Sequence, residues 1–236
     1  MIFFLWRKNQ IKKYKGKDLT KEAYNDIRKM MFSNELKPGQ KIPYRRMAEG
    51  LSMSLTPVVQ ALKHMEFMGL VHHEQNKGFF VEKVTPREID EAYQLRSIIE
   101  PKMLKETILN LDEQGSKTIK TALDGYIDAC QKGSLKLKLV KDIQFHMSIA
   151  ELSGQNLSIL ILRYLFDFLY LRFGQELIFS RPSEDSVHDN TAIFNAIVSR
   201  DIETASKILK QHIKNIHKNA LEGIQERLAE AEDIIF

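Results

Sequence analysis

The sequence predicts a mainly α-helical protein with an N-terminal winged helix-turn-helix, of three helices and a small β-hairpin wing, and a C-terminal all-helical antiparallel bundle. Three observations support this prediction. Residues 42–81 contain two short helical patterns, a tight turn and a hairpin pattern tipped by Lys77 and Gly78. Residues 85–236 show successive amphipathic segments with almost no strand alternation. Basic residues are concentrated in residues 1–83, which hold 16 Lys and Arg against 8 Asp and Glu.

The length and composition favour a two-domain globular protein of the cytoplasm. The chain has 236 residues, and a single cysteine, Cys130, excludes an internal disulfide. The apolar start of the chain spans only six residues, too few for a signal peptide or a membrane span. Charges at Arg163, Asp167 and Arg172 interrupt the longest apolar run, residues 157–179, so we expect a buried helix and no membrane partner.

The N-terminal part divides into a basic leader, residues 1–17, and a winged helix-turn-helix, residues 18–84. The first helix is predicted from Asp18 to about Leu36. Its expected inner face is Ala23, Ile27, Met30 and Met31. The second helix of the helix-turn-helix is predicted from Thr56 to Met68, with Ser54 at its cap and Pro57 in its first turn. Its expected buried stripe is Val58, Ala61, Leu62, Met65 and Met68.

A basic head on an acidic remainder indicates a polyanion-binding module, and a winged helix-turn-helix lays its second helix in the DNA major groove. The alternative for the charge is a solvated basic tail, because seven basic residues fall within the first 21. Thr56 has the alternative role of a helix-start residue, and Lys63 that of a solvated surface charge. The predicted DNA-binding residues are Arg45, Ser54, Thr56, Gln60, Lys63, Lys77 and Gly78.

Several spaced motifs in this region resemble the DNA-binding domain of the GntR family. In chain order they occupy residues 24–28, 36–42, 47–48, 54–58, 61–62, 69–71 and 78–81. The resemblance implies that Arg45 contacts DNA. The family also places arginine at two points of the recognition helix, where this chain has Leu55 and Val59. A bidentate arginine–guanine contact is worth about 1–3 kcal/mol of discrimination, so these departures imply a different operator or weaker specificity.

The remainder, residues 85–236, is predicted to form six helices near 87–111, 116–131, 135–152, 156–178, 187–199 and 202–230. Polar residues interrupt the apolar stripes of these helices. Asp142 and His146 lie one turn apart, His212 is surrounded by apolar positions, and Arg96 and Asn190 continue two other stripes. Buried charges and imidazoles are costly unless they are paired or bind a metal.

Asp142, His146 and His212 together supply one carboxylate oxygen and two imidazole nitrogens, a set suited to a divalent metal such as zinc or nickel. The alternative is a buried Asp–His hydrogen-bond network without a metal. For His146 or His212 taken singly, a satisfied core histidine is the more common role.

Residues 87–220 also resemble the FCD domain, the helical effector-binding domain of FadR-type GntR regulators. The resemblance implies a metal held by Asp142, His146 and His212, with Asn190 at the position of a fourth ligand that is usually histidine. An asparagine oxygen ligates transition metals more weakly than imidazole. The resemblance further implies a small carboxylate effector bound by Arg96 and Asn190. The alternative for Arg96 is an internal salt bridge to Glu100 or Asp142.

We therefore expect a homodimeric, DNA-binding transcription regulator whose affinity for double-stranded operator DNA is controlled by a small organic acid. A constitutive dimeric DNA-binding protein with a purely structural bundle is the first alternative. A metal-dependent hydrolase is the second, although no general base stands out beside the predicted metal site and an enzyme has no need of the basic head. We predict no catalytic residues.

Overall fold

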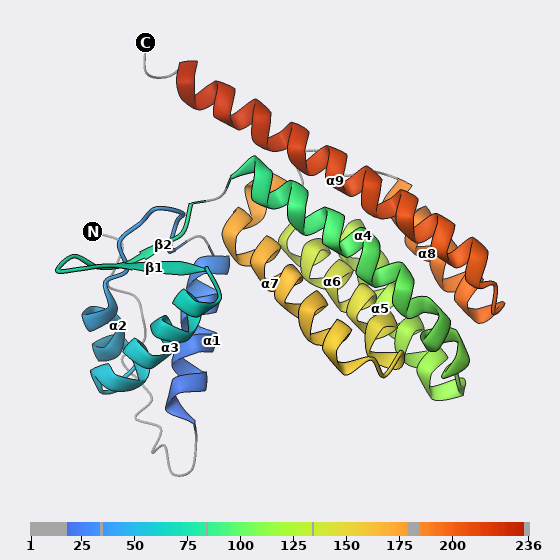
Figure 1. The fold of residues 1–236 in the computed structure, drawn as a ribbon, viewed down its shortest axis with the longest axis horizontal. Coiled ribbons are helices and arrows are strands. Elements are labelled where there is room, and N and C mark those ends of the chain that lie inside the picture. The colour runs from blue at the N-terminus through green and yellow to red at the C-terminus, as the bar shows by residue number, and fades with distance from the viewer. Residues whose placement is uncertain (1–17, 34, 84, 134, 179–184, 234–236) are drawn as a thin grey trace. The chain divides into compact units, whose positions relative to one another are not determined.

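The computed structural model of the chain describes residues 18–33, 35–83, 85–133, 135–178 and 185–233 (Figure 1). The chain folds as two compact units, and the division falls between Val84 and Thr85. The predicted fold class is confirmed, because the described elements are helices apart from one two-stranded sheet in the first unit. The leader predicted for residues 1–17 lies outside the described residues.

The first unit contains helices α1 (Leu19–Phe32), α2 (Tyr44–Gly50) and α3 (Leu55–Phe67), followed by strands β1 (Val71–Glu74) and β2 (Gly78–Val81). Both α1 and α2 pack against α3, which buries one side of α3 and leaves the other side at the surface. This arrangement is a helix-turn-helix with a hairpin wing.

Helix α1 is shorter than the sequence pattern predicts. Asp18 caps it, because its Oδ1 accepts from the backbone N–H groups of Thr20 and Lys21 at 3.1 Å each. The helix ends at Phe32, four residues earlier than expected, because the chain turns to bury Leu36. Met30, expected on the inner face, is only partly buried. Side-chain burial at residue 36 therefore decides where the helix ends.

Helix α3 is displaced by one residue from the predicted bounds. Ser54 occupies the N-cap with an extended backbone, as expected, but its side chain makes no capping hydrogen bond. Pro57 explains this difference: it stands at the third helical position, whose N–H is a usual partner of a capping side chain, and proline has none. Of the expected stripe only Met68 is partly exposed, since the helix ends at Phe67.

The wing is an antiparallel hairpin whose register pairs Val71 with Val81 and Glu74 with Gly78. Sequence reasoning did not anticipate a further pairing, in which Lys41 forms an isolated bridge with Phe80. The segment before α2 thus closes onto the wing and ties the hairpin to the helices.

Within the described residues the second unit contains six helices: α4 (Pro86–Leu109), α5 (Glu113–Gln131), α6 (Leu135–Leu152), α7 (Asn156–Ile178), α8 (Asp185–Val198) and α9 (Ile202–Asp233). Helix α4 begins with a complete capping box, in which Thr85 and Glu88 satisfy each other's backbone N–H groups. The most extensive helix–helix contacts join α4 to α9 and α5 to α6, and α4 also packs on α6, α7 and α8. Helix α4 therefore packs against α6, α7, α8 and α9.

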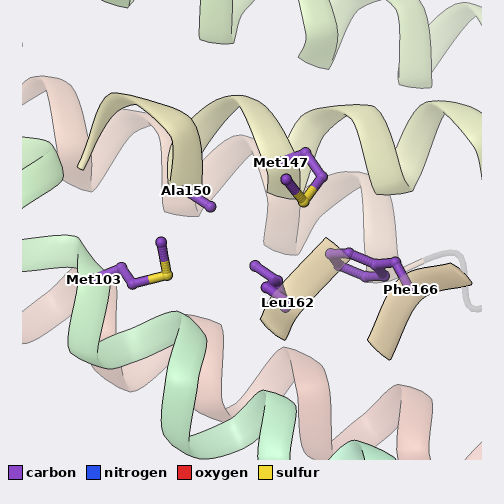
Figure 2. Close-up of a cluster of buried hydrophobic side chains, with 5 residues drawn as sticks. All are labelled: Met103, Met147, Ala150, Leu162 and Phe166. Atoms are coloured by element: carbon purple, nitrogen blue, oxygen red, sulfur yellow. The ribbon is translucent and has the colours of Figure 1, made fainter. Parts of the chain in front are cut away.

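Part of the bundle core lies between α4, α6 and α7 (Figure 2). The buried side chains there are Met103, Met147, Ala150, Leu162 and Phe166. This apolar packing fixes the separation of α4 and α6, which is what places polar residues of the two helices opposite each other. No helix within the described residues combines the length and the apolar character that crossing a bilayer requires.

Candidate functional site

The predicted metal ligands come together inside the bundle. Asp142 and His146 lie on α6, and His212 lies on α9; one ligand atom from each can be chosen so that all lie within 4.8 Å of one another. All three residues are buried, with at most 6 % of their surface exposed. The fold therefore brings His212 close to Asp142, about 70 positions earlier in the sequence, in the interior of the bundle.

Two carboxylates orient the two histidines. The Nδ1 of His146 donates to Glu100 Oε2 at 2.6 Å, and the Nδ1 of His212 lies 3.3 Å from Asp189 Oδ2. The rings of His146 and His212 stack with centroids 5.3 Å apart. With Nδ1 engaged in this way, each ring keeps an Nε2 lone pair for a ligand, and carboxylates commonly fix the tautomer of metal-binding histidines in this manner.

Asn190, on α8, completes the cluster. Its Nδ2 donates to Asp142 Oδ1 at 3.0 Å, while Asp142 Oδ2 lies 3.8 Å from His146 Nε2. Within this cluster of Asp142, Asn190 and the two histidines, three buried atoms have no hydrogen-bond partner among the described residues: the Nε2 atoms of His146 and His212, and Asn190 Oδ1. Buried polar atoms are normally satisfied, so three orphans in one cluster are the strongest local sign of a missing ligand. His188 is exposed and cannot substitute for Asn190.

These donors fit a divalent transition metal in chemistry and number. Bonds to zinc from histidine nitrogen and carboxylate oxygen are about 2.0–2.2 Å long, so two donors at the tetrahedral angle around one ion lie about 3.3–3.6 Å apart. The observed limit of 4.8 Å is wider by roughly 1 Å or more. Two imidazoles and one carboxylate, with an amide oxygen nearby, would thus hold the ion once their ligand atoms move together by roughly 1 Å.

Arg96 is already paired, as the salt-bridge alternative predicted. Its Nε donates to Glu100 Oε1 at 2.7 Å, and both side chains are about 95 % buried or more. The guanidinium lies over the ring of Phe166, 4.5 Å from its centroid. The Nη2 of Arg96 nevertheless has no partner within the described part of the chain. Arg96 therefore retains hydrogen-bond donors for an anion.

The side chain of Glu100 is stabilised in its ionised form. Burial alone would raise the pKa of this carboxyl, but Arg96 and His146 outweigh burial and lower the pKa from 4.5 to about 2. Burial also raises the pKa of the Tyr93 phenol to about 12, so Tyr93 is neutral beside the guanidinium. At neutral pH the core of the site is an ionised Glu100 between a guanidinium and an imidazole.

Free space beside this cluster is small. A cavity of about 20 Å³ is lined by Tyr93, Arg96, Asp142 and Phe166 together with other apolar side chains. This volume is about that of one water molecule. A small organic acid would therefore enter only if the surrounding helices moved apart.

The predicted DNA-contacting residues lie at the surface of the first unit, except for one. Exposed side chains belong to Arg45, Ser54, Thr56, Gln60, Lys63 and Lys77. Gly78 is buried and has φ of +101°, with Tyr44 Cε1 only 3.3 Å from where a Cβ would stand. The fold itself therefore requires glycine there, independently of any approach to DNA.

Sequence reasoning missed the role of two residues in the site. Glu100 was considered only as a partner of Arg96, and Asp189 was not considered. Spacing provides a partial signal for the first, because Arg96 and Glu100 are four residues apart on one helix. No comparable signal exists for Asp189, which approaches His212 from a different helix.

Comparison with known proteins places both units in described families. The gntR family of bacterial regulatory proteins matches residues 19–81, and the FCD domain matches residues 91–215. The chain is 22 % identical to the HTH-type transcriptional regulator YdhC of Bacillus subtilis, over 90 % of this chain and 93 % of that protein. It is 25 % identical to the transcriptional regulator McbR of Escherichia coli, over 87 % and 82 % of the two chains.

Solved structures agree in fold. The structure of E. coli McbR/YncC superposes with a TM-score of 0.74 at 22 % identity, covering 89 % of this chain and 99 % of that one. A GntR-type regulator structure from Rhodococcus sp. RHA1 also gives a TM-score of 0.74, at 20 % identity, with coverage of 87 % and 99 %. The chain therefore belongs to the GntR family of bacterial regulatory proteins, as a DNA-binding transcriptional regulator with a C-terminal FCD domain.

Proposed function

We propose that this regulator binds operator DNA as a homodimer and that a small carboxylate, bound beside a divalent metal in the FCD domain, controls its operator affinity. The observation that carries the proposal is a group of buried polar atoms that lie close together and lack a hydrogen-bond partner among the described residues. The orphaned atoms of His146, His212 and Asn190 suit a metal, and the spare Arg96 Nη2 suits a carboxylate.

Effector entry has a physical route to the DNA-binding unit. The cavity holds about one water molecule, so binding an acid requires the helices around Arg96 to move. Arg96 lies on α4, which begins at Pro86, only a few residues after the wing strand β2 ends at Val81. A displacement of α4 would therefore act on the point where the chain enters the DNA-binding unit. Coupling of this kind is typically worth about 1–3 kcal/mol, or roughly 5–150-fold in affinity.

Exposed apolar side chains support the dimer. Helices α4 and α7 pack together, and large apolar side chains on both are open to solvent: Leu95, Ile98, Leu157 and Leu160, with exposed fractions of 45 %, 64 %, 72 % and 62 %. Such side chains on neighbouring helices are typical of a subunit interface. We expect Ile98→Asp combined with Leu160→Asp to yield monomers in light scattering, whereas Val198→Asp, at an exposed apolar site on α8, leaves the dimer intact.

Metal analysis tests the sensor. We expect the purified full-length protein to bind about one zinc or nickel ion per chain, and His212→Ala or Asp142→Ala to abolish binding. The matched control is His188→Ala, which removes an exposed imidazole and should retain the metal. If the wild type binds no divalent metal in titration calorimetry at neutral pH, the metal part of the proposal is wrong.

Operator binding tests the switch. Gel-shift titrations of the metal-loaded protein with a panel of small mono- and dicarboxylates should reveal at least one that changes operator affinity fivefold or more. Arg96→Met should lose this response while still binding DNA. Unchanged affinity at saturating concentration of an acid that demonstrably binds the bundle would refute the switch and favour a constitutive regulator.

A further inference from the structure

The recognition helix α3 presents a continuous surface on the side opposite its core contacts. Its buried residues are Pro57, Val58, Ala61, Leu62 and Met65. The opposite side carries Leu55, Thr56, Val59, Gln60, Lys63 and Phe67, which follow one another around about 140° of the helix at 100° per residue. In a helix-turn-helix protein, the first turns of this side face the base edges.

This surface has almost no positive charge. Lys63 is the one lysine or arginine in α3, and its Nζ lies 2.7 Å from Glu66 Oε2 and 5.3 Å from the centroid of the Phe79 ring. Arginine or lysine bound to guanine O6 and N7 is the commonest specific contact in the major groove. Helix α3 has no arginine for it, and its single lysine is already engaged with a carboxylate.

The exposed side of the first two turns of α3 instead carries apolar side chains at Leu55 and Val59. Leu55 is 41 % exposed although it is a large apolar residue, and Val59, one turn later on the same side, is partly exposed. The C5-methyl of thymine is the one apolar group that a base pair offers in the major groove, and aliphatic side chains contact it. We infer that Leu55 and Val59 read thymine methyl groups, so the base pairs facing the start of α3 are A·T.

The polar neighbours on the same turns are compatible with A·T pairs. The Oε1 of Gln60 accepts a hydrogen bond from Thr20 Oγ1 at 2.9 Å, and the Nε2 of the same exposed amide carries two donor hydrogens. These donors suit adenine N7 or thymine O4, both acceptors in the major groove. Thr56 is exposed between Leu55 and Gln60 and contributes a hydroxyl and a further methyl group. The inference rests on the DNA-binding role of the family and adds the identity of the bases read.

Selection from a randomised duplex library, with the full-length protein, tests the inference. We expect enriched half-sites with A·T pairs where α3 docks. Deoxyuridine, which lacks only the methyl group, should then replace each thymine in turn. One thymine or more in each half-site should lose about fourfold in affinity, as expected for removing one buried methyl group. A thymine outside the half-sites is the control and should be insensitive.

Variants connect the methyl effect to α3. Leu55→Ala and Val59→Ala should weaken binding to the selected site and make the deoxyuridine duplex bind as well as the thymine duplex. Phe67→Ala, which removes an exposed apolar side chain at the far end of the same helix, should leave the methyl effect unchanged. Leu55→Arg should move the selected base pair from A·T to G·C.

Three outcomes would overturn the inference. Enriched half-sites with invariant G·C pairs under α3, or equal affinity for thymine and deoxyuridine duplexes, would show that the protein reads other groups while its DNA-binding role stands. Failure to enrich any sequence would overturn both the inference and sequence-specific binding by this chain.

Discussion

Replacing Arg96 by methionine should destabilise the bundle far more than replacing an exposed arginine in an equivalent ion pair. Arg96 and Glu100 form a buried i, i+4 pair on α4, and the same helix carries an exposed i, i+4 pair, Arg87 and Glu91, with N–O distances of 2.7 and 3.0 Å. Spacing and helix are thus matched, and burial differs: the exposed fractions are 3 % for Arg96 and 87 % for Arg87.

The magnitude follows from the state of Glu100. Arg96 and His146 overcome burial and hold the pKa of the Glu100 carboxyl at about 2 rather than 4.5, a difference that corresponds to about 3 kcal/mol in favour of the charged form. Removing one partner of a buried pair strands the other charge and typically costs about 3–5 kcal/mol. We therefore expect Arg96→Met to lower the free energy of unfolding by about 3 kcal/mol, and Arg87→Met by no more than about 0.5 kcal/mol.

Urea unfolding at pH 7, followed by circular dichroism, measures both losses. The double variant Arg96→Met with Glu100→Gln should recover a large part of the loss, because no charge is then stranded and the Gln oxygen still accepts from His146. Equal effects of Arg96→Met and Arg87→Met, or no recovery in the double variant, would refute this reasoning.

Three further predictions concern pH and packing. Because the folded-state pKa of Glu100 lies below the ordinary value, its contribution is complete above about pH 4.5 and is lost as the pH falls towards 2, so the acid-induced loss of stability should be shallower in Glu100→Gln. Gly115→Ala should cost about 1–3 kcal/mol in thermal unfolding, because a Cβ would lie 2.9 Å from Leu152 Cδ2, whereas Gly125→Ala on the same helix, with 3.5 Å of clearance, should be neutral or stabilising. Thr85→Ala should cost about 1 kcal/mol by removing the capping box of α4.

Local patterns in the sequence predicted most of the fold, because local chemistry decides helix starts and stripes. Thr85 indicates the start of a helix, and the alternation around Lys77 and Gly78 indicates a hairpin, and both signals are local in the sequence. The end of α1 was misjudged because the burial of Leu36 against the rest of the first unit, and not local propensity, ends that helix. The bridge from Lys41 to Phe80 was missed for a related reason: it joins segments almost forty residues apart.

The same distinction applies to the candidate site. Asp142, His146 and His212 could be singled out because polar residues on apolar stripes are costly wherever the helices pack. The carboxylates that support the two histidines could not be predicted from the sequence. The position of Glu100 against His146, and of Asp189 against His212, depends on how four helices pack together. Periodicity thus finds the residues that must be buried, and tertiary packing decides which atoms satisfy them.

Asn190 shows why the supporting contacts matter for function. In the folded chain its amide donates to Asp142, so it positions the one carboxylate of the predicted metal set while its own oxygen stays unpartnered. An imidazole at this position would be a stronger ligand for a transition metal, whereas an amide binds more weakly and leaves the ion more open to a further oxygen ligand. Under the proposed function, a site of this composition would favour an effector whose carboxylate binds the ion and the Nη2 of Arg96 together. Under the same proposal, weak binding of the ion by the protein would make metal binding and effector binding depend on each other.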